Sequence, residues 1–207
     1  MVAYGITVFG KRELIAFRQV RGESYDAWLG FIDDLYKRGV KGASLRLIIT
    51  DGSKALHGAL DMVYPLTLRQ ACWVHKLRNV SNYLPKRYQE DCHNQAAKIY
   101  LAKSKQEALS FFKTWRKHWL KICPKAVKCL ESSIDNLLNF FDCPRKHWVK
   151  IRTTNVIERQ FKEVRRRTNV FSCFSNIASC DRIIYAIFTH INNNWKDRPL
   201  KDFTQFA

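Results

Sequence analysis

The amino-acid sequence predicts an α/β fold, in which a mixed sheet packs against helices and an all-helical insertion interrupts the sheet. Short runs with strand character alternate with helical patterns over residues 1–76. Strand signals then stop, and over residues 77–141 aromatic and aliphatic residues recur at helical spacing. Two more helical patterns follow, one from about Asn155 and one over residues 177–195.

The chain is expected to open with a β-hairpin and a helix. Residues 2–8 and 13–20 predict two strands around the turn Phe9-Gly10-Lys11-Arg12. Ser24 is the expected N-cap of the first helix, and Gly39 closes that helix as a C′ residue should.

A strand is expected before Asp51-Gly52 and a helix after it. Residues 45–50 form a short apolar run, typical of a buried strand, and stop at Asp51-Gly52. A helical pattern runs from Ser53 to about Val63, and residues 68–74 then predict another strand.

Charge is the unusual property of this chain. Its 207 residues include 36 Lys and Arg against 18 Asp and Glu, so the formal net charge is +18. Such an excess makes a polyanion such as DNA the expected partner, because each neutralised phosphate releases counterions. Hydrophobic residues make up 46% of the chain, which excludes global disorder.

The sequence also favours a cytoplasmic protein that has no contact with a membrane. No secretion signal opens it, and no apolar run approaches the ~20 residues that span a bilayer. Seven cysteines at irregular spacing, without a signal peptide, indicate reduced thiols.

Asp51 is the first candidate for chemistry. It follows a strand and precedes a helix, where α/β sheets place ligands and catalytic groups. A carboxylate there suits a hard cation such as Mg²⁺. Position alone favours the alternative, in which Asp51 makes an Asx turn or caps the helix.

Glu158 is the second candidate acid. It lies three residues after Asn155, the spacing of a capping box, which is the alternative to metal binding. Basic residues surround it, so one helix face presents a carboxylate followed by cations, as an enzyme that holds a phosphodiester against metal requires. A solvated basic face is the alternative. The candidate DNA-binding residues are Lys150, Arg152, Arg159, Lys162, Arg165, Arg166 and Arg167.

The pair Cys72 and His75 has the two-residue gap of a zinc-binding pair. The remaining cysteines and histidines form no clean second pair, which counts against zinc. The alternative is a buried strand cysteine followed by a histidine at the rim of a crevice, where His75 contacts DNA or a reacting oxygen.

Several separate motifs occur in order along the chain. They are Asp51-Gly52 after an apolar strand, Cys72-Trp73-Val74-His75-Lys76-Leu77-Arg78-Asn79, His147-Trp148, Ile151-Arg152-Thr153-Thr154-Asn155-Val156-Ile157-Glu158 and Val164-Arg165-Arg166-Arg167-Thr168. Together they resemble the Mutator-type transposases of bacterial insertion sequences, a DDE transposase family. The resemblance runs over residues 3–195.

The resemblance implies an RNase H-like fold with a helical insertion between the second and third members of an Asp-Asp-Glu triad. Asp51 would be the second Asp and Glu158 the third acid, both binding Mg²⁺ or Mn²⁺. Cys72 and His75 match the family's Cys-x-x-His signature beside the active site, and His75 joins the acids as a catalytic candidate. The first Asp would stand on a strand before residue 2, so a truncated copy with its first strand missing, inactive by itself, is expected.

The resemblance also implies a domain order and partners. Residues 1–76 would be a partial RNase H-like core, 77–150 the helical insertion, 151–195 the returning helices and 196–207 a loosely held C-terminal tail. The substrate would be DNA, both transposon ends and target, and the protein partner a second copy or a full-length transposase. The alternatives are a DNA-binding remnant that regulates a transposase without catalysis, and a free-standing RNase H-like nuclease or resolvase.

Overall fold

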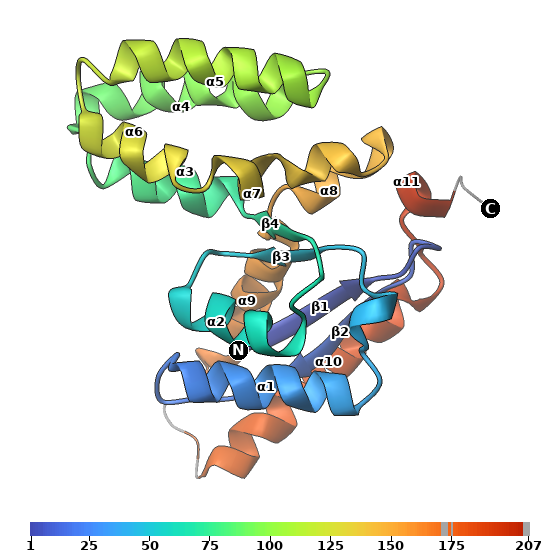
Figure 1. The fold of residues 1–207 in the computed structure, drawn as a ribbon. Helices are drawn as coiled ribbons and strands as arrows, with labels where there is room; N and C mark the ends of the chain where they lie inside the picture. The colour runs from blue at the N-terminus through green and yellow to red at the C-terminus, as the bar shows by residue number, and fades with distance from the viewer. Residues whose placement is uncertain (171–173, 175, 205–207) are drawn as a thin grey trace. The chain divides into compact units, whose positions relative to one another are not determined.

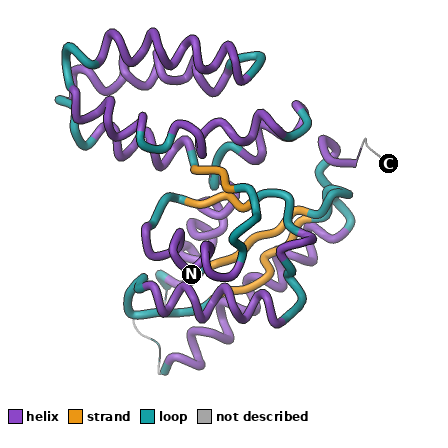
Figure 2. The backbone as a smooth tube through the Cα atoms, viewed as in Figure 1, coloured by secondary structure: helices purple, strands orange, loops and turns teal. Residues whose placement is uncertain are grey.

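The structure, a computed structural model, describes residues 1–170, 174 and 176–204. The chain forms two compact units. We call Met1–Lys41, Ala55–Pro65 and Asn155–Ala207 the terminal unit, and Gly42–Lys54 and Leu66–Thr154 the central unit. Helices dominate the described chain, and the strands are short (Figures 1 and 2). The mixed α/β class is therefore confirmed, with two small sheets in the described residues.

The terminal unit contains the predicted hairpin and the late helices. Its elements are β1 (Val2–Ile6), β2 (Arg12–Phe17), α1 (Tyr25–Lys37), α2 (Lys54–Val63), α9 (Asn155–Thr168), α10 (Ile177–Lys196) and α11 (Lys201–Thr204). β1 and β2 pair antiparallel. Ser24 caps α1 as expected, because its hydroxyl accepts a hydrogen bond from the backbone N–H of Ala27 at 3.2 Å. Gly39 follows α1 with a φ of 104°, the left-handed conformation that favours glycine.

The core of the terminal unit joins the hairpin to α10. Leu14 on β2 packs with Ile187, Phe188 and Ile191 on α10, which runs along the hairpin in Figure 1. The rings of Phe17 and Phe188 meet edge to face, with centroids 5.4 Å apart. The apolar spacing of α10 therefore has the expected purpose, since it buries one helix face against the hairpin.

The end of the described chain is better held than the sequence suggested. The backbone N–H of Leu200 donates to the carbonyl of Gly10 at 2.9 Å, and Phe203 in α11 is buried. Gly10 has a φ of 76°, and a Cβ there would lie 2.5 Å from the Leu200 carbonyl oxygen. Residues 196–204 are thus docked on the hairpin turn, a tertiary contact that local sequence does not encode, and the rest of the expected tail lies outside the described residues.

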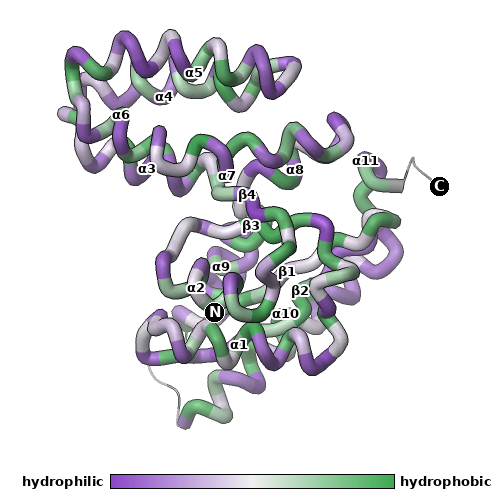
Figure 3. The backbone as a smooth tube through the Cα atoms, viewed as in Figure 1, coloured by the Kyte–Doolittle hydropathy of each residue, from purple (hydrophilic) through white to green (hydrophobic). Residues whose placement is uncertain are grey.

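The central unit begins with a short parallel sheet and continues as helices. Its elements are a 3₁₀ turn (Gly42–Ser44), β3 (Ile48–Thr50), β4 (Arg69–Ala71), α3 (Trp73–Ser81), α4 (Lys86–Leu101), α5 (Lys105–Trp119), α6 (Pro124–Glu131), α7 (Ile134–Leu138), two further 3₁₀ turns (Asn139–Asp142 and Arg145–His147) and α8 (Trp148–Ile151). The expected run of helices after residue 77 is confirmed. Hydrophobic and hydrophilic residues alternate along the paired helices α4 and α5, as amphipathic packing requires (Figure 3).

Two sequence-based expectations about strands need correction. The strand expected over residues 68–74 ends at Ala71, and α3 begins at Trp73. The reason is tertiary, because the Trp73 N–H donates to the carbonyl of Arg152 at 3.1 Å instead of continuing the ladder. Instead of one mixed sheet, the described residues form an antiparallel pair, β1–β2, and a parallel pair, β3–β4.

A buried polar network holds β4 in the central unit. Gln70 is completely buried, and its side-chain oxygen accepts a hydrogen bond from the Phe140 N–H at 2.7 Å. Its amide nitrogen donates to the Leu137 carbonyl at 3.0 Å, and the Trp73 indole N–H donates to the same carbonyl at 2.8 Å. Buried polar groups are tolerated when they are paired in this way, so the network fixes the strand that leads into α3.

Candidate functional site

Asp51 and Cys72 lie at the same edge of the parallel sheet. Thr50 and Ala71 are opposite one another at the carboxyl ends of β3 and β4. The N–H of Cys72 donates to the Thr50 carbonyl at 2.8 Å, so pairing extends one residue beyond the strand. The residues that follow both strands therefore emerge at the same edge of this sheet.

The Asp51 carboxylate is exposed and locally oriented. Its Oδ1 accepts a hydrogen bond from the Ser53 N–H at 3.3 Å, which is the geometry of an Asx turn. Gly52 between them has a φ of 96°, a conformation that a side chain would strain. The Asx-turn alternative is thus realised, and it is compatible with ligand binding because the carboxylate remains exposed to solvent.

The Cys-x-x-His motif holds Thr154. The sulfur of Cys72, which is only 1% exposed, accepts hydrogen bonds from the backbone N–H and the hydroxyl of Thr154, each at 3.3 Å. The same hydroxyl lies 3.3 Å from Nδ1 of His75. The Thr154 hydroxyl can take part in both interactions because it has one proton to donate and lone pairs to accept, and the tautomer of His75 decides which group donates between them.

Sequence reasoning missed Thr154 as a functional candidate. Thr154 was part of a motif, but nothing in the local pattern linked it to a cysteine 82 residues earlier. The feature that could have pointed to Thr154 is its position directly before helix α9, where the chain passes from the central unit to the terminal unit. Only the folded chain brings Cys72, His75 and Thr154 together.

Arg152 has structural partners in the central unit. Its guanidinium Nη1 donates to the Tyr100 carbonyl at 2.8 Å and lies over the Tyr100 ring, 5.1 Å from the centroid. Partial burial lowers the pKa of the Arg152 guanidinium, because the charged form loses hydration. Arg152 therefore differs from the exposed cations of the predicted DNA-binding set, because its guanidinium already has partners. Lys150, another member of that set, is half-buried on α8.

Helix α9 carries Glu158 in its first turn and most of the predicted cations. Arg159, Lys162, Arg165, Arg166 and Arg167 are all exposed. α9 begins at Asn155, so Asn155 is itself helical rather than the residue before the helix that a capping box requires. The three arginines in the last turn also have a favourable interaction with the helix dipole.

Glu163 pairs with two of these arginines. Its carboxylate accepts hydrogen bonds from Arg166 at 2.9 and 3.0 Å and from Arg167 at 2.7 Å. The bonds from Arg166 and then Arg167 lower the pKa of Glu163 to about 2. Glu163 therefore stays ionised at neutral pH and orders the two guanidinium groups on the helix surface.

The two candidate acids belong to different units of the chain. Asp51 is part of the central unit and Glu158 part of the terminal unit. Within residues 1–170, 174 and 176–204, no three His, Cys, Asp or Glu side chains are grouped so that they could hold a metal ion. As single ligands, the carboxylate oxygens of Asp51 and Glu158 have the hard-donor chemistry that Mg²⁺ requires.

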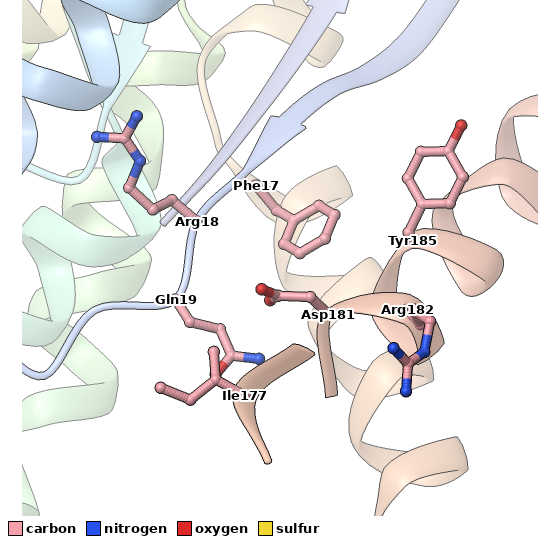
Figure 4. A pocket seen from close by; sticks show the side chains of 7 residues that line it. All are labelled: Phe17, Arg18, Gln19, Ile177, Asp181, Arg182 and Tyr185. Carbon is pink, nitrogen blue, oxygen red and sulfur yellow. The ribbon is translucent and has the colours of Figure 1, made fainter. Parts of the chain in front are cut away.

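A separate hollow in the terminal unit involves none of the predicted site residues. Side chains from the end of β2 and from α10 face a space of about 410 Å³ (Figure 4). Oδ1 of Asp181 is enclosed there and has no hydrogen-bond partner among the residues that the structure describes. The lining residues are Phe17, Arg18, Gln19, Ile177, Asp181, Arg182 and Tyr185.

None of the described helices is both long enough and apolar enough to cross a membrane.

Comparison with known proteins places the chain in a family. Residues 1–198 match the family described as "Transposase, Mutator family". The chain is 32% identical over 197 residues to the transposase for insertion sequence element ISRM5 of Rhizobium meliloti, covering 95% of this chain and 49% of the relative. It is 40% identical over 168 residues to the transposase for IST2 of Acidithiobacillus ferrooxidans, covering 81% and 56%.

A third relative is the transposase for IS256 in transposon Tn4001 of Staphylococcus aureus, which is 29% identical over 200 residues, covering 94% of this chain and 50% of the relative. The chain thus spans about half the length of the curated relatives it matches. The family predicted from the motifs is confirmed: this chain belongs to the Mutator family of transposases of bacterial insertion sequences.

Proposed function

We propose that this chain carries catalytic residues of an insertion-sequence transposase, which cuts DNA at the ends of the element and joins them to target DNA. The observation that carries the proposal is the family match over residues 1–198, which includes every residue of the candidate site. The strong positive charge supports DNA as the substrate. An RNase H-like arrangement of the core, with residues 77–150 as its insertion and a homo-oligomer as the working form, belongs to the same proposal.

We assign Asp51 and Glu158 as metal-binding carboxylates. A bound Mg²⁺ or Mn²⁺ would supply Lewis-acid activation of the attacking oxygen and neutralise charge on the phosphate. Asp51 fits that role because its carboxylate is exposed at the carboxyl end of a parallel strand and is oriented by its Asx turn. Glu158 fits it as an acid in the first turn of a helix rich in exposed cations.

The cations of α9 would hold the DNA backbone. Arg159, Lys162 and Arg165 are exposed, and phosphate binding needs donors that reach solvent. Arg166 and Arg167 are held by Glu163, so they present their remaining donors from a fixed position. Contacts of this kind position DNA and carry no base specificity.

A chimeric transposase tests the proposal. The region of the ISRM5 transposase that matches this chain is replaced by residues 1–198, and Mg²⁺-dependent cleavage and strand transfer are measured on DNA that carries the ISRM5 ends. We expect activity in the chimera, loss of it in Asp51→Asn and Glu158→Gln, and nearly unchanged DNA binding in both variants.

Two surface variants serve as controls. Asp135→Asn and Glu90→Gln remove the same charges at exposed positions outside the proposed site and should leave activity intact. A chimera whose Asp51→Asn variant still cleaves would show that Asp51 is not a metal ligand.

The second candidate is a DNA-binding protein without catalysis, which would regulate a full-length transposase by occupying transposon ends or forming mixed oligomers. The exposed cations of α9 favour it, because phosphate binding requires no metal site. Its signature in the same experiment is a folded chimera that binds DNA at the expected affinity and never cleaves.

A further inference from the structure

We propose that Thr154 is a positioning residue, held by Cys72 and His75 so that helix α9 starts from a fixed point. This inference rests on the proposed function, because its consequence is the placement of Glu158. The Cys-x-x-His motif then has a structural role. Cys72 and His75 hold the segment that leads to a catalytic acid, rather than binding metal or reacting with DNA.

Thr154 forms hydrogen bonds with both residues of the Cys-x-x-His motif. Thr154 uses both its backbone N–H and its hydroxyl on the Cys72 sulfur, each at 3.3 Å, and its hydroxyl also meets His75 Nδ1 at 3.3 Å. We call these three interactions the Thr154 latch. Two residues earlier, the Arg152 carbonyl accepts from the Trp73 N–H at 3.1 Å. The chain before α9 is therefore fastened at two points to the start of α3.

The residues that hold Thr154 are buried. Cys72 is 1% exposed and Trp73 is 1% exposed, so the anchor of the latch is packed in the interior. An enclosed sulfur that already accepts two hydrogen bonds is poorly placed to meet solvent or a substrate. The same sulfur suits a fixed support, because a packed side chain in one rotamer cannot move without opening a cavity.

Thr154 is directly followed in the chain by the helix that carries Glu158. Thr154 is the last residue of the central unit, and Asn155 begins both the terminal unit's final segment and α9. Glu158 follows Thr154 by one helical turn. The anchor of the latch, Cys72, lies at the sheet edge where Asp51 also emerges. Within the central unit, the latch thus fixes the residue that directly precedes the helix carrying Glu158.

Threonine is suited to this position for a specific reason. It offers a hydroxyl that both donates and accepts, so it can satisfy a sulfur and an imidazole nitrogen at once. Serine retains that hydroxyl, whereas valine has the same shape without it. The pair Thr154→Val and Thr154→Ser therefore separates the hydrogen bonds from the volume of the side chain.

Hydrogen exchange on the 207-residue chain is the readout that does not depend on activity. In Cys72→Ala, the amide proton of Thr154 and those of the first turn of α9 should exchange at least ~10-fold faster, because the sulfur acceptor is gone. Thr154→Val should accelerate the same turn, and Thr154→Ser should not. Thr153→Val and Cys129→Ala are matched controls, since neither side chain takes part in the latch.

Cleavage by the chimera then tests the link to catalysis. We expect Thr154→Val to lower the cleavage rate about 100-fold, as misplacement of a catalytic group by about 1 Å does, with DNA affinity unchanged. Thr154→Ser should recover the rate to within a few-fold. Melting temperatures of all variants are measured, so that a loss of rate caused by unfolding is recognised by a lower melting temperature. If Thr154→Ser loses as much rate as Thr154→Val while both remain folded, the hydroxyl does not position the helix.

The outcomes separate the inference from the proposed function. If Thr154→Val cleaves and exchanges like Thr153→Val, Thr154 is not a positioning residue, while loss of activity in Asp51→Asn still supports the transposase site. If Asp51→Asn and Glu158→Gln both cleave normally, the proposed site fails whatever Thr154 does. Stoichiometric zinc bound by the purified chain and lost in Cys72→Ala would overturn the latch in favour of metal binding.

Discussion

The side-chain amide of Asn192 pairs with both backbone groups of Leu14. Its oxygen accepts from the Leu14 N–H at 2.9 Å, and its nitrogen donates to the Leu14 carbonyl at 3.1 Å. Leu14 lies on β2, whose other side pairs with β1. Asn192 on α10 thus pairs the backbone groups of Leu14, which would otherwise be unpaired at the edge of the hairpin. Leu14 itself belongs to the buried cluster that the hairpin forms with α10.

Removing that amide should destabilise the terminal unit. Asn192→Ala leaves a part-buried N–H and carbonyl without their partner, which costs about 2–3 kcal/mol of unfolding free energy. Asn193→Ala, at the exposed neighbouring position, should change it by less than about 0.5 kcal/mol. Urea unfolding of the purified chain measures both, and equal effects would mean that Asn192 contributes only helix propensity.

The buried amide of Gln70 leads to a second stability prediction. Gln70→Leu deprives the buried Phe140 N–H of its acceptor, and we expect a loss of about 2–3 kcal/mol. The Ala71 carbonyl also loses the bond that the Gln70 amide donates at 2.7 Å, whereas the Leu137 carbonyl keeps its bond from Trp73. Gln106→Leu on the exposed face of α5 is the control and should be nearly neutral. Identical urea midpoints for the two variants would contradict the role of the network.

DNA binding should depend strongly on salt and weakly on sequence. If about six phosphates are contacted, the plot of log affinity against log salt should have a slope near −5. Changing Arg165, Arg166 and Arg167 to Ala should weaken binding to all sequences alike and reduce the slope. Filter binding over a salt series measures this, and a flat slope would remove the electrostatic basis of the proposal.

Glu163 offers a sharper variant on the same helix. Glu163→Gln removes the acid that pairs with Arg166 and Arg167, so both guanidinium groups gain freedom to meet phosphate. We expect tighter DNA binding and a steeper salt slope from this single change. Glu90→Gln makes the same charge change on α4, so an equal gain there would show that net charge alone is responsible.

The pairing of Glu163 is also pH-dependent. Because its pKa falls from 4.5 to about 2 in the folded chain, the pairing stabilises the fold fully above the unfolded pKa and is lost as pH falls through about 2. Carboxyl chemical shifts of Glu163 followed by NMR should therefore titrate well below 4.5, the ordinary value of a glutamate. Arg166→Ala combined with Arg167→Ala should return the Glu163 titration toward 4.5.

The local sequence was sufficient to predict helix ends, helix faces and the motifs that contain the candidate site residues. Ser24 and Gly39 mark the ends of α1, because caps and left-handed glycines act within a few residues of the backbone groups they satisfy. The apolar face of α10 follows from the 3.6-residue period. The motifs around Asp51, Cys72 and Glu158 were sufficient to identify the family, since they are separate patterns in a fixed order.

Tertiary structure alone decided where strands stop and which distant groups meet. Residues 72–74 have the composition of a strand, yet the chain turns into α3 there because the carbonyl of Arg152 accepts the N–H of Trp73. The bonds of Thr154 to Cys72 and of Asn192 to Leu14 join residues 82 and 178 positions apart. Hydrogen bonds across such separations depend on how packed elements converge, and no local periodicity or propensity contains that information.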